Sequence, residues 1–329
     1  MDSLLEVRGL SVEFRSRSRR LPAVRDVSFE IGAGDSLGVL GESGSGKSVT
    51  ALAIMGLLDR KRTVVRGEIL FEGIDLRRIR EAKAGSFRGG QIGMVFQDAL
   101  AALNPVQTVG ASIAEVLAYH AKAGRRSARH RAIDLMERVG IPAPATRYGS
   151  YPHEMSGGMR QRIMIAMALA AGPKLLIADE PTTSLDVTVQ AQIMDLLKGL
   201  RAETGMSMLF ITHDLGLSME VADRLAVMYA GRIVEAGPAR EVYTHPTHPY
   251  TRGLVDSMPR RTKKGQRLKP IPGAPPSLVA LPAGCPFHPR CARAIERCTQ
   301  ERPKLREVAV GHESACHLVL LPTKEASAP

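Results

Sequence analysis

The sequence contains no tryptophan, and it has only seven phenylalanines and six tyrosines in 329 residues. With so few aromatic side chains, a buried core must rest mainly on Val, Ile, Leu, Met and Ala. A chain of this length is long enough to bury such a core, and it can hold one large domain with a smaller appendage.

Long hydrophobic runs are also missing. The longest uncharged apolar run is Ile163–Pro173, which is too short to cross a bilayer. The N-terminus carries Asp2, Glu6 and Arg8 where an export signal needs an apolar stretch. We therefore expect no export signal, and a chain that is soluble or is held at a membrane by a partner.

Cysteine is absent from most of the chain, and all four cysteines lie in the tail: Cys285, Cys291, Cys298 and Cys316. A cytosolic protein keeps its thiols reduced, so a disulfide framework is not expected. Cysteine ligands of structural zinc usually come in pairs roughly two to four residues apart, which is tighter than the spacing here. Four thiolates also suit a [4Fe–4S] cluster. The cluster, a zinc site that includes His288, His312 or His317, and free thiols are the three interpretations.

Acidic residues are too few to balance the basic ones, and the formal net charge is +12. Clustered Lys and Arg can bind nucleic-acid phosphates. Here the basic residues form short separate groups without interleaved aromatics that could stack on bases. We interpret these groups as solvated surface that can face anionic lipid heads, and expect no nucleic-acid partner: Arg15–Arg20, Arg60–Arg62, Arg125–Arg131 and Arg260–Lys269.

A glycine-rich segment is the strongest motif that is present. It follows a short apolar run, Ser36–Leu40, and precedes a helical pattern that extends through Leu58. This strand–loop–helix context is typical of a loop whose backbone N–H groups surround phosphate oxygens. Lys47 is expected to reach the β- and γ-phosphates, and the Ser48 hydroxyl to ligate Mg²⁺. The predicted nucleotide-binding residues are Gly41, Glu42, Ser43, Gly44, Ser45, Gly46, Lys47, Ser48 and Val49.

Three further motifs follow in order along the chain. The apolar run Leu175–Ala178 ends in Asp179 and Glu180, adjacent carboxylates that are costly to hold together without cations. We expect Asp179 to hold Mg²⁺. A serine–glycine turn at Ser156 opens a helical pattern, and His213 follows the apolar run 208–211.

This ordered set resembles the ATP-binding cassette (ABC) family. The resemblance implies an α/β P-loop NTPase fold with a RecA-like core, an antiparallel β subdomain and an inserted helical subdomain, here at about residues 98–160. It implies that Glu180 polarises the attacking water, that Gln97 contacts Mg²⁺ and this water, and that His213 contacts the γ-phosphate. Phe14 is the candidate for the aromatic ring that stacks on adenine, and a core phenylalanine is the alternative.

The resemblance also implies that two subunits share each ATP. In the family, a segment like Ser156, Gly157 and Gly158 points at the γ-phosphate held by the second subunit, and the loop of Ser184 and Asp186 crosses the same interface. Because every catalytic position is filled, we expect hydrolysis as well as binding of ATP. The absence of an internal repeat argues against two cassettes in one chain.

Other segments resemble one branch of the family, the oligopeptide/dipeptide importers, and within it the D-type ATPase. The branch implies an ATPase that powers peptide import, with nickel or glutathione as alternative cargo. Its implied partners are a second, paralogous ATPase, two permease subunits and an extracytoplasmic binding protein, which places the chain on the cytoplasmic face of the inner membrane. The family tail is associated with a [4Fe–4S] cluster. The matching segments are His153–Arg162, Gln97–Asp98, Leu103–Pro105, Ala178–Leu185, Thr247–Tyr250 and Gly284–Cys291.

A nucleic-acid-associated cassette ATPase is the main alternative from another class. Such proteins interrupt the cassette with long coiled coils or zinc modules, or fuse two cassettes, and this sequence shows neither.

We expect two domains, an ATPase domain at residues 1–258 and a cysteine-containing domain at residues 259–329. Composition changes after Gly237, where prolines become frequent. Helical spacing of apolar residues is seen at Ile113–Leu117 and Ile133–Val139. Predicted strands are Leu5–Phe14, Val24–Ile31, Ser36–Leu40, Gly67–Leu76, Ile92–Phe96, Leu175–Ala178, Met208–Ile211 and a hairpin of Arg224–Met228 with Arg232–Ala236.

Overall fold

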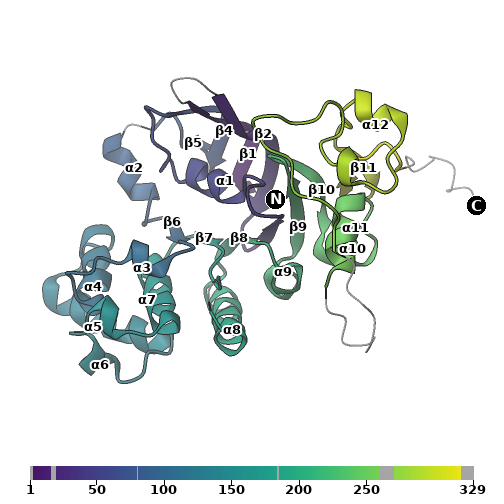
Figure 1. Ribbon diagram of the computed structural model, residues 1–329. Helices are drawn as coiled ribbons and strands as arrows, with labels where there is room; N and C mark the ends of the chain where they lie inside the picture. Colours follow the sequence, from purple (N-terminus) through teal and green to yellow (C-terminus); the bar gives the residue numbers. More distant parts are fainter. Residues whose placement is uncertain (1–2, 16–19, 80, 184, 259–269, 320–329) are drawn as a thin grey trace, which may run out of the picture. The chain divides into compact units, whose positions relative to one another are not determined.

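The computed structural model describes residues 3–15, 20–79, 81–183, 185–258 and 270–319 (Figure 1). The chain divides into two units. Most of the basic loop at Arg15–Arg20, the basic linker from Arg260 to Lys269 and the predicted interface residue Ser184 lie outside the described residues. Unit 1 comprises Met1–Leu5, Ile31–Ser36 and Phe71–Ile211, and unit 2 comprises Glu6–Glu30, Leu37–Leu70 and Thr212–Pro329.

Three short parallel strands organise unit 1: β6 (Ile92–Val95), β7 (Leu175–Asp179) and β8 (Ser207–Thr212). β6 pairs with β7 and β7 pairs with β8, and all their residues are buried. Parallel strands covered on both faces consist of near-continuous apolar runs, which is the pattern that predicted them. Because parallel strands end at the same edge, the residues that follow β6 and β7 lie close together.

Helices make up most of the rest of unit 1. α4 (Val109–His120) and α5 (Arg125–Arg138) pack against each other and against α7 (Gly157–Leu169). The buried side chains of Ile113 and Leu117 on α4, and of Met136 and Val139 at the C-terminal end of α5, confirm the helical spacing seen in the sequence. The helices are α2 (Glu81–Phe87), α3 (Ala99–Ala102), α4 (Val109–His120), α5 (Arg125–Arg138), α6 (Pro144–Arg147), the 3-10 turn Pro152–Glu154, α7 (Gly157–Leu169) and α8 (Val187–Thr204).

Unit 2 contains the strand that leads into the phosphate loop. β3 (Ser36–Leu40) is parallel to β9 (Arg224–Tyr229), which forms the predicted antiparallel hairpin with β10 (Arg232–Pro238). Pairing continues from β10 to β12 (His312–Ser314) and then to β11 (Arg306–Ala309). The sequence predicted no strands in the tail, because segments of this length are too short to show a period. A second group of neighbouring strands is β2 (Arg20–Gly32), β1 (Ser3–Arg15) and β4 (Thr63–Phe71).

Two predicted boundaries are wrong, and glycine explains both. The single strand predicted at Gly67–Leu76 is β4 followed by β5 (Ile74–Asp75), because Glu72 and Gly73 both take positive φ and turn the chain. The helix α1 (Lys47–Ile54) stops before Leu58, because Gly56 has a φ of 61° and ends the helix.

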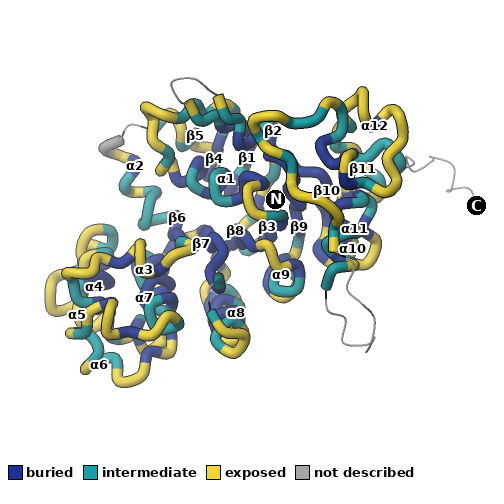
Figure 2. Tube along the Cα trace, viewed as in Figure 1, coloured by how far each residue is buried: buried dark blue, intermediate teal, exposed yellow. Residues whose placement is uncertain are grey.

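The core of unit 2 gathers aromatic side chains although the sequence has few. The rings of Tyr229 and Tyr250 have centroids 4.6 Å apart, and Phe287 lies 5.3 Å from Tyr229 in an edge-to-face arrangement. This cluster joins β9, α11 (Pro249–Asp256) and the cysteine-containing tail into one buried core (Figure 2). The other helices of unit 2 are α9 (Leu215–Val221), α10 (Ala239–Thr244), α11 (Pro249–Asp256), the 3-10 turn His288–Arg290 and α12 (Glu296–Gln300).

Within the described residues, no helix combines the length and the apolar character that crossing a bilayer requires.

Candidate active site

The phosphate loop, Gly41–Ser48, connects β3 to α1 in unit 2, and two of its glycines cannot be replaced without a clash. A Cβ on Gly41 would lie 2.3 Å from the carbonyl oxygen of Met228. A Cβ on Gly46 would lie 2.7 Å from the carbonyl oxygen of Ala23, and Gly46 has a φ of 104°. The loop backbone is therefore held in a shape that only glycine allows at these positions.

The charged and hydroxyl groups of the loop fit a phosphate ligand. Lys47 is only 4% exposed, and its Nζ donates to the carbonyl oxygens of Gly41, at 2.7 Å, and of Glu42, at 3.1 Å. The Oγ of Ser45 is buried, and it has no hydrogen-bond partner within the described residues. Ser48 and Val49, in the first turn of α1, are half-buried. A buried ammonium beside an unpaired hydroxyl, inside a glycine loop at a helix N-terminus, is the donor set that phosphates require.

Gln97 and Glu180 meet at the carboxyl edge of the parallel strands of unit 1. Gln97 Nε2 donates to Glu180 Oε2 at 3.0 Å, and Thr183 Oγ1 donates to the same oxygen at 2.9 Å. Glu180 is 9% exposed and its neighbour Asp179 is 5% exposed. The structure therefore brings together the glutamine and the carboxylates that the sequence placed at the ends of two different strands.

Glu180 is also held by its backbone. Its φ of 46° is rare for a residue with a side chain, and its N–H donates to the carbonyl oxygen of Ile211 at 2.8 Å. Strained backbone of this kind is concentrated at functional sites.

The serine–glycine turn lies on the surface of unit 1. Ser156 caps α7, because its Oγ accepts a hydrogen bond from the N–H of Met159 at 3.3 Å. The first turn of α7 contains no acidic residue, so the positive end of the helix dipole is not neutralised there. Ser156 and Gly157 are exposed and Gly158 is half-buried, with Val189 so close to it that an added Cβ would lie 2.7 Å from Cγ1.

The remaining predicted residues have simpler surroundings. Asp186 is exposed and caps α8, because its Oδ1 accepts from the N–H of Val189 at 3.0 Å. In unit 2, Phe14 is half-buried near the end of β1. His213 is exposed between β8 and α9. The described contacts of these three residues do not test their predicted roles, which stay predictions.

The cysteines form a group of thiols in unit 2, and none of them is in a disulfide. Burial, together with the three neighbouring thiols, outweighs a hydrogen bond from the backbone of Phe287 and raises the pKa of Cys285 to about 11. Burial also raises the pKa of Cys291 and of Cys316. Neighbouring thiols act in the same direction, Cys298 on Cys291 and both of these on Cys316. Among the described residues, however, no three His, Cys, Asp or Glu side chains are arranged as a set of metal ligands.

The sequence did not indicate the contacts that link the phosphate loop to the tail. Arg290 forms a two-pronged ion pair with Glu42, and the hydroxyl of Tyr250 accepts a hydrogen bond from the N–H of Glu42 at 2.9 Å. No local pattern could have revealed them, because Glu42 and Arg290 are 248 positions apart.

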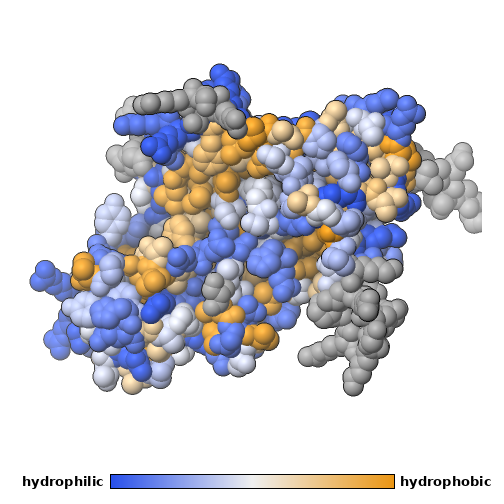
Figure 3. Space-filling model, in the orientation of Figure 1, coloured by the Kyte–Doolittle hydropathy of each residue, from blue (hydrophilic) through white to orange (hydrophobic). Residues whose placement is uncertain are grey.

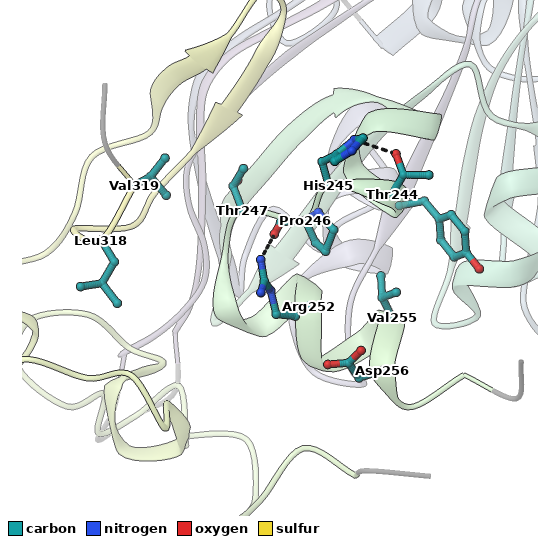
Figure 4. A pocket seen from close by; sticks show the side chains of 10 residues that line it. Thr244, His245, Pro246, Thr247, Arg252, Val255, Asp256, Leu318 and Val319 are labelled. Carbon is teal, nitrogen blue, oxygen red and sulfur yellow. Dashed lines mark hydrogen bonds between the residues drawn. The ribbon is translucent and has the colours of Figure 1, made fainter. Parts of the chain in front are cut away.

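A separate cavity of about 640 Å³ in unit 2 is lined by none of the predicted site residues. It lies between the segment that joins α10 to α11 and the end of the described tail at Leu318 and Val319 (Figure 4). Arg252 donates to the carbonyl oxygen of Pro246 at 3.1 Å and so holds that segment in place.

Comparison with known families places both parts of the chain. Residues 24–183 match the ABC transporter family, and residues 234–298 match the oligopeptide/dipeptide transporter C-terminal region. The second match includes Cys285, Cys291 and Cys298.

Similar proteins extend along nearly the whole chain. BMEII0863 of Brucella melitensis, named as a candidate peptide import ATP-binding protein, is 50% identical over 325 residues, covering 95% of this chain and 96% of that protein. The dipeptide transport ATP-binding protein DppD of Escherichia coli is 47% identical over 318 residues, or 97% of each chain. The oligopeptide transport ATP-binding protein OppD of Mycobacterium tuberculosis is 49% identical over 318 residues, which are 96% of this chain and 52% of that protein.

Solved structures give the same result for the fold. The ATP-binding cassette MJ0796, in a dimeric post-hydrolysis state bound to ADP and Pi, superposes with a TM-score of 0.65 at 26% identity, covering 72% of this chain and 99% of that one. The chain therefore belongs to the ABC transporter family, as an ATP-binding subunit that carries the oligopeptide/dipeptide transporter C-terminal region.

Proposed function

We propose that this chain hydrolyses ATP to power the import of di- and oligopeptides through a membrane complex. The observation that carries the proposal is the pairing of a nucleotide motif set with an oligopeptide/dipeptide transporter C-terminal region in one chain. Relatives named for dipeptide and oligopeptide transport, which align with almost all of this chain, support the choice of cargo.

The partners are two permease subunits, an extracytoplasmic peptide-binding protein and a second, paralogous ATPase, and the chain works as a peripheral subunit on the cytoplasmic face of the inner membrane. Exposed apolar side chains support a docking role for the segment that follows Gln97. Leu100 is 53% exposed and Val106 is 82% exposed. Figure 3 shows apolar surface in the region that Figure 1 labels α3.

In the proposed reaction, the phosphate loop of unit 2 binds and orients the triphosphate, with Lys47 on its β- and γ-phosphates. Ser48 and Asp179 are the residues that would hold Mg²⁺, and the ion would supply positive charge to balance the charge on the phosphates. Glu180, oriented by Gln97 and Thr183, accepts a proton from the attacking water. His213 contacts the γ-phosphate, and Phe14 stacks on the adenine.

Each site is completed by a second ATPase subunit. The exposed Ser156 and Gly157, at the positive end of α7, supply hydrogen-bond donors to the γ-phosphate held by the other subunit, and Asp186 lies at the same interface. Binding of ATP then closes the pair of subunits, and hydrolysis reopens it. This rigid-body movement is what drives the permeases.

For the tail, we propose that the four cysteines ligate a [4Fe–4S] cluster, with Zn²⁺ as the alternative. Four thiols that influence one another, none of them in a disulfide, are a suitable donor set. Like-charge repulsion among thiolates, which opposes ionisation of the group, is relieved by a bound cation. The side chains must first move into a ligand arrangement, because the described conformation does not hold one.

Elemental analysis of anaerobically purified protein tests the tail. We expect about four irons and four acid-labile sulfides per chain, with a visible absorbance band, and loss of both in Cys298→Ser. One zinc per chain without sulfide would show that the cysteines bind zinc and not an iron–sulfur cluster. Four titratable thiols without any metal would contradict both the cluster and the zinc site.

The transport proposal is tested by reconstitution. The chain, its paralogous ATPase and the two permeases are placed in proteoliposomes with the binding protein, and uptake of a labelled dipeptide and a labelled tetrapeptide is measured. We expect uptake that requires ATP and is lost in Lys47→Ala. Uptake of nickel or glutathione without peptide uptake would show that the proposed peptide cargo is wrong. Tight binding to DNA or ribosomes would contradict the transporter assignment.

A further inference from the structure

Arg290, in the cysteine-containing tail, is bonded to the second residue of the phosphate loop. Its Nη1 donates to Glu42 Oε2 at 2.6 Å and its Nη2 donates to Glu42 Oε1 at 2.9 Å. The side chain of Arg290 is 6% exposed and that of Glu42 is 26% exposed. A two-pronged guanidinium–carboxylate pair is stronger and more directional than a single hydrogen bond, and here it is mostly shielded from water.

Arg290 is fixed on its other sides as well. Its Nε donates to the carbonyl oxygen of Pro272 at 2.8 Å, and its Nη1 lies 3.3 Å from the hydroxyl oxygen of Tyr229. The guanidinium carbon lies 5.8 Å from the ring centroid of Tyr229 and 5.9 Å from that of Phe287. The hydrogen bonds to Glu42 outweigh burial and raise the pKa of Arg290. Nearly all of its donors are therefore used within unit 2.

A carboxylate in this position needs such a partner. Glu42 belongs to a loop that must accept a triphosphate, and a free negative charge there would repel the ligand. The backbone of Glu42 also supports the loop, because its carbonyl accepts from Lys47 Nζ and its N–H donates to the Tyr250 hydroxyl. Arg290 both neutralises the carboxylate and fixes where it lies.

The cysteine region determines where Arg290 stands. The residue ends the 3-10 turn His288–Arg290, which lies between two cysteines. The N–H of Cys285 donates to the carbonyl oxygen of Cys298 at 2.8 Å, and the N–H of His288 donates to the carbonyl oxygen of Cys285 at 3.0 Å. The turn that carries Arg290 is thus built on the backbone of the cysteine segment.

We propose that Arg290 is a positioning residue for ATP binding, which acts from the C-terminal region by neutralising and anchoring Glu42 in the phosphate loop. It follows that nucleotide affinity depends on the tail, although the tail supplies none of the groups that bind phosphate. This inference rests on the nucleotide site at Gly41–Ser48, and it requires neither the peptide cargo nor the cluster.

Equilibrium binding of a non-hydrolysable ATP analogue with Mg²⁺ to the full-length chain tests the proposal. Arg290→Met is expected to raise the Kd at least about tenfold, or about 1.4 kcal/mol. Adding Glu42→Gln to Arg290→Met is expected to recover most of the lost affinity, because it removes the uncompensated charge. A purely structural role for Arg290 would not produce this recovery.

Arg297→Met is the matched control. Arg297 lies in the same tail on α12 and pairs with Glu301 at 2.7 Å, but its side chain is 55% exposed. We expect its Kd to stay within about twofold of the wild type. Arg290→Lys keeps the charge but loses the two-pronged geometry, so an intermediate Kd is expected even if Arg290→Met does not fold.

Three results would overturn the inference: a wild-type Kd for Arg290→Met, a double variant as weak as the single one, or a wild-type Kd for Arg290→Lys when Arg290→Met does not fold. The wild-type measurement separates failure of this inference from failure of the proposed function. If the wild-type chain binds no ATP analogue, the proposed function fails, whereas unchanged binding in the Arg290 variants defeats only this inference.

Discussion

At the residue scale, Glu180 can be tested with little disturbance of the fold. Its carboxylate accepts hydrogen bonds from Gln97 and Thr183, and glutamine at this position has nearly the same size. In Glu180→Gln we expect ATP binding to persist and steady-state hydrolysis to fall at least about 100-fold, because the proton acceptor for the attacking water is lost. Phosphate release at saturating ATP, in the presence of the partner ATPase, measures the change.

Glu203→Gln provides the control for this substitution. Glu203 lies on α8 in the same unit, with a side chain 62% exposed and paired with Arg138 at 2.9 Å. Its hydrolysis rate should stay near that of the wild type. Undiminished hydrolysis in Glu180→Gln would remove Glu180 from the proposed role.

At the element scale, the start of α11 makes the stability of unit 2 depend on pH. His248 caps α11 with its Nδ1, which accepts a hydrogen bond from the N–H of Tyr250 at 3.0 Å, and burial lowers the pKa of His248 to about 4. Between its ordinary pKa near 6.5 and this value, only the unfolded chain takes up the proton, so stability falls as pH falls. The free energy of unfolding falls by on the order of 3 kcal/mol over this whole pH range.

Glu235, on β10, acts in the same direction at lower pH. Burial alone would raise its pKa, but hydrogen bonds from His312, Thr247 and other neighbours outweigh burial and lower it. A lowered carboxyl pKa gives stability that is lost as pH falls through the folded-state value. Glu235 is fully buried and holds His312 of β12 at 2.8 Å, so its protonation also loosens the tail strands.

We therefore expect the Tm to drop steadily from pH 7.5 to pH 5, and to drop less in His248→Asn, which keeps a capping acceptor without a titrating ring. His130→Asn, at an exposed position on α5, should follow the wild-type curve. Equal pH slopes for His248→Asn and the wild type would show that this histidine does not cause the dependence.

The elements also show what a sequence can reveal. The phosphate loop, the buried strands β3, β6, β7 and β8, and the cap at Ser156 follow from local rules on glycine, apolar runs and helix starts, and each was predictable. The meeting of Gln97 and Glu180 was expected only from the family resemblance, which assigns both residues to the same water, and the structure explains it by parallel strands that end at one edge. By contrast, β11 and β12 are too short for a period, and the pair of Arg290 with Glu42 depends on tertiary packing that no local pattern encodes.

At the scale of the whole molecule, the chain carries both a nucleotide-binding loop and an exposed serine–glycine turn that, in the proposed mechanism, serves another subunit. Dilute isolated chain should therefore hydrolyse ATP slowly, and activity per molecule should rise with protein concentration or with added paralogous ATPase. Initial rates over a wide concentration range test this expectation. A rate per molecule that is constant and unaffected by the paralogue would contradict a shared site.

The ion pair of Glu42 with Arg290 has a consequence for the order of events during synthesis. The two residues are 248 positions apart, so a ribosome has made most of the protein before the early loop meets its counter-ion. A growing polypeptide, or a fragment that stops before residue 290, holds an unbalanced carboxylate beside its phosphate-binding glycines. Its affinity for nucleotide should reach the full value only when the last part of the chain has been released and has packed against the phosphate loop.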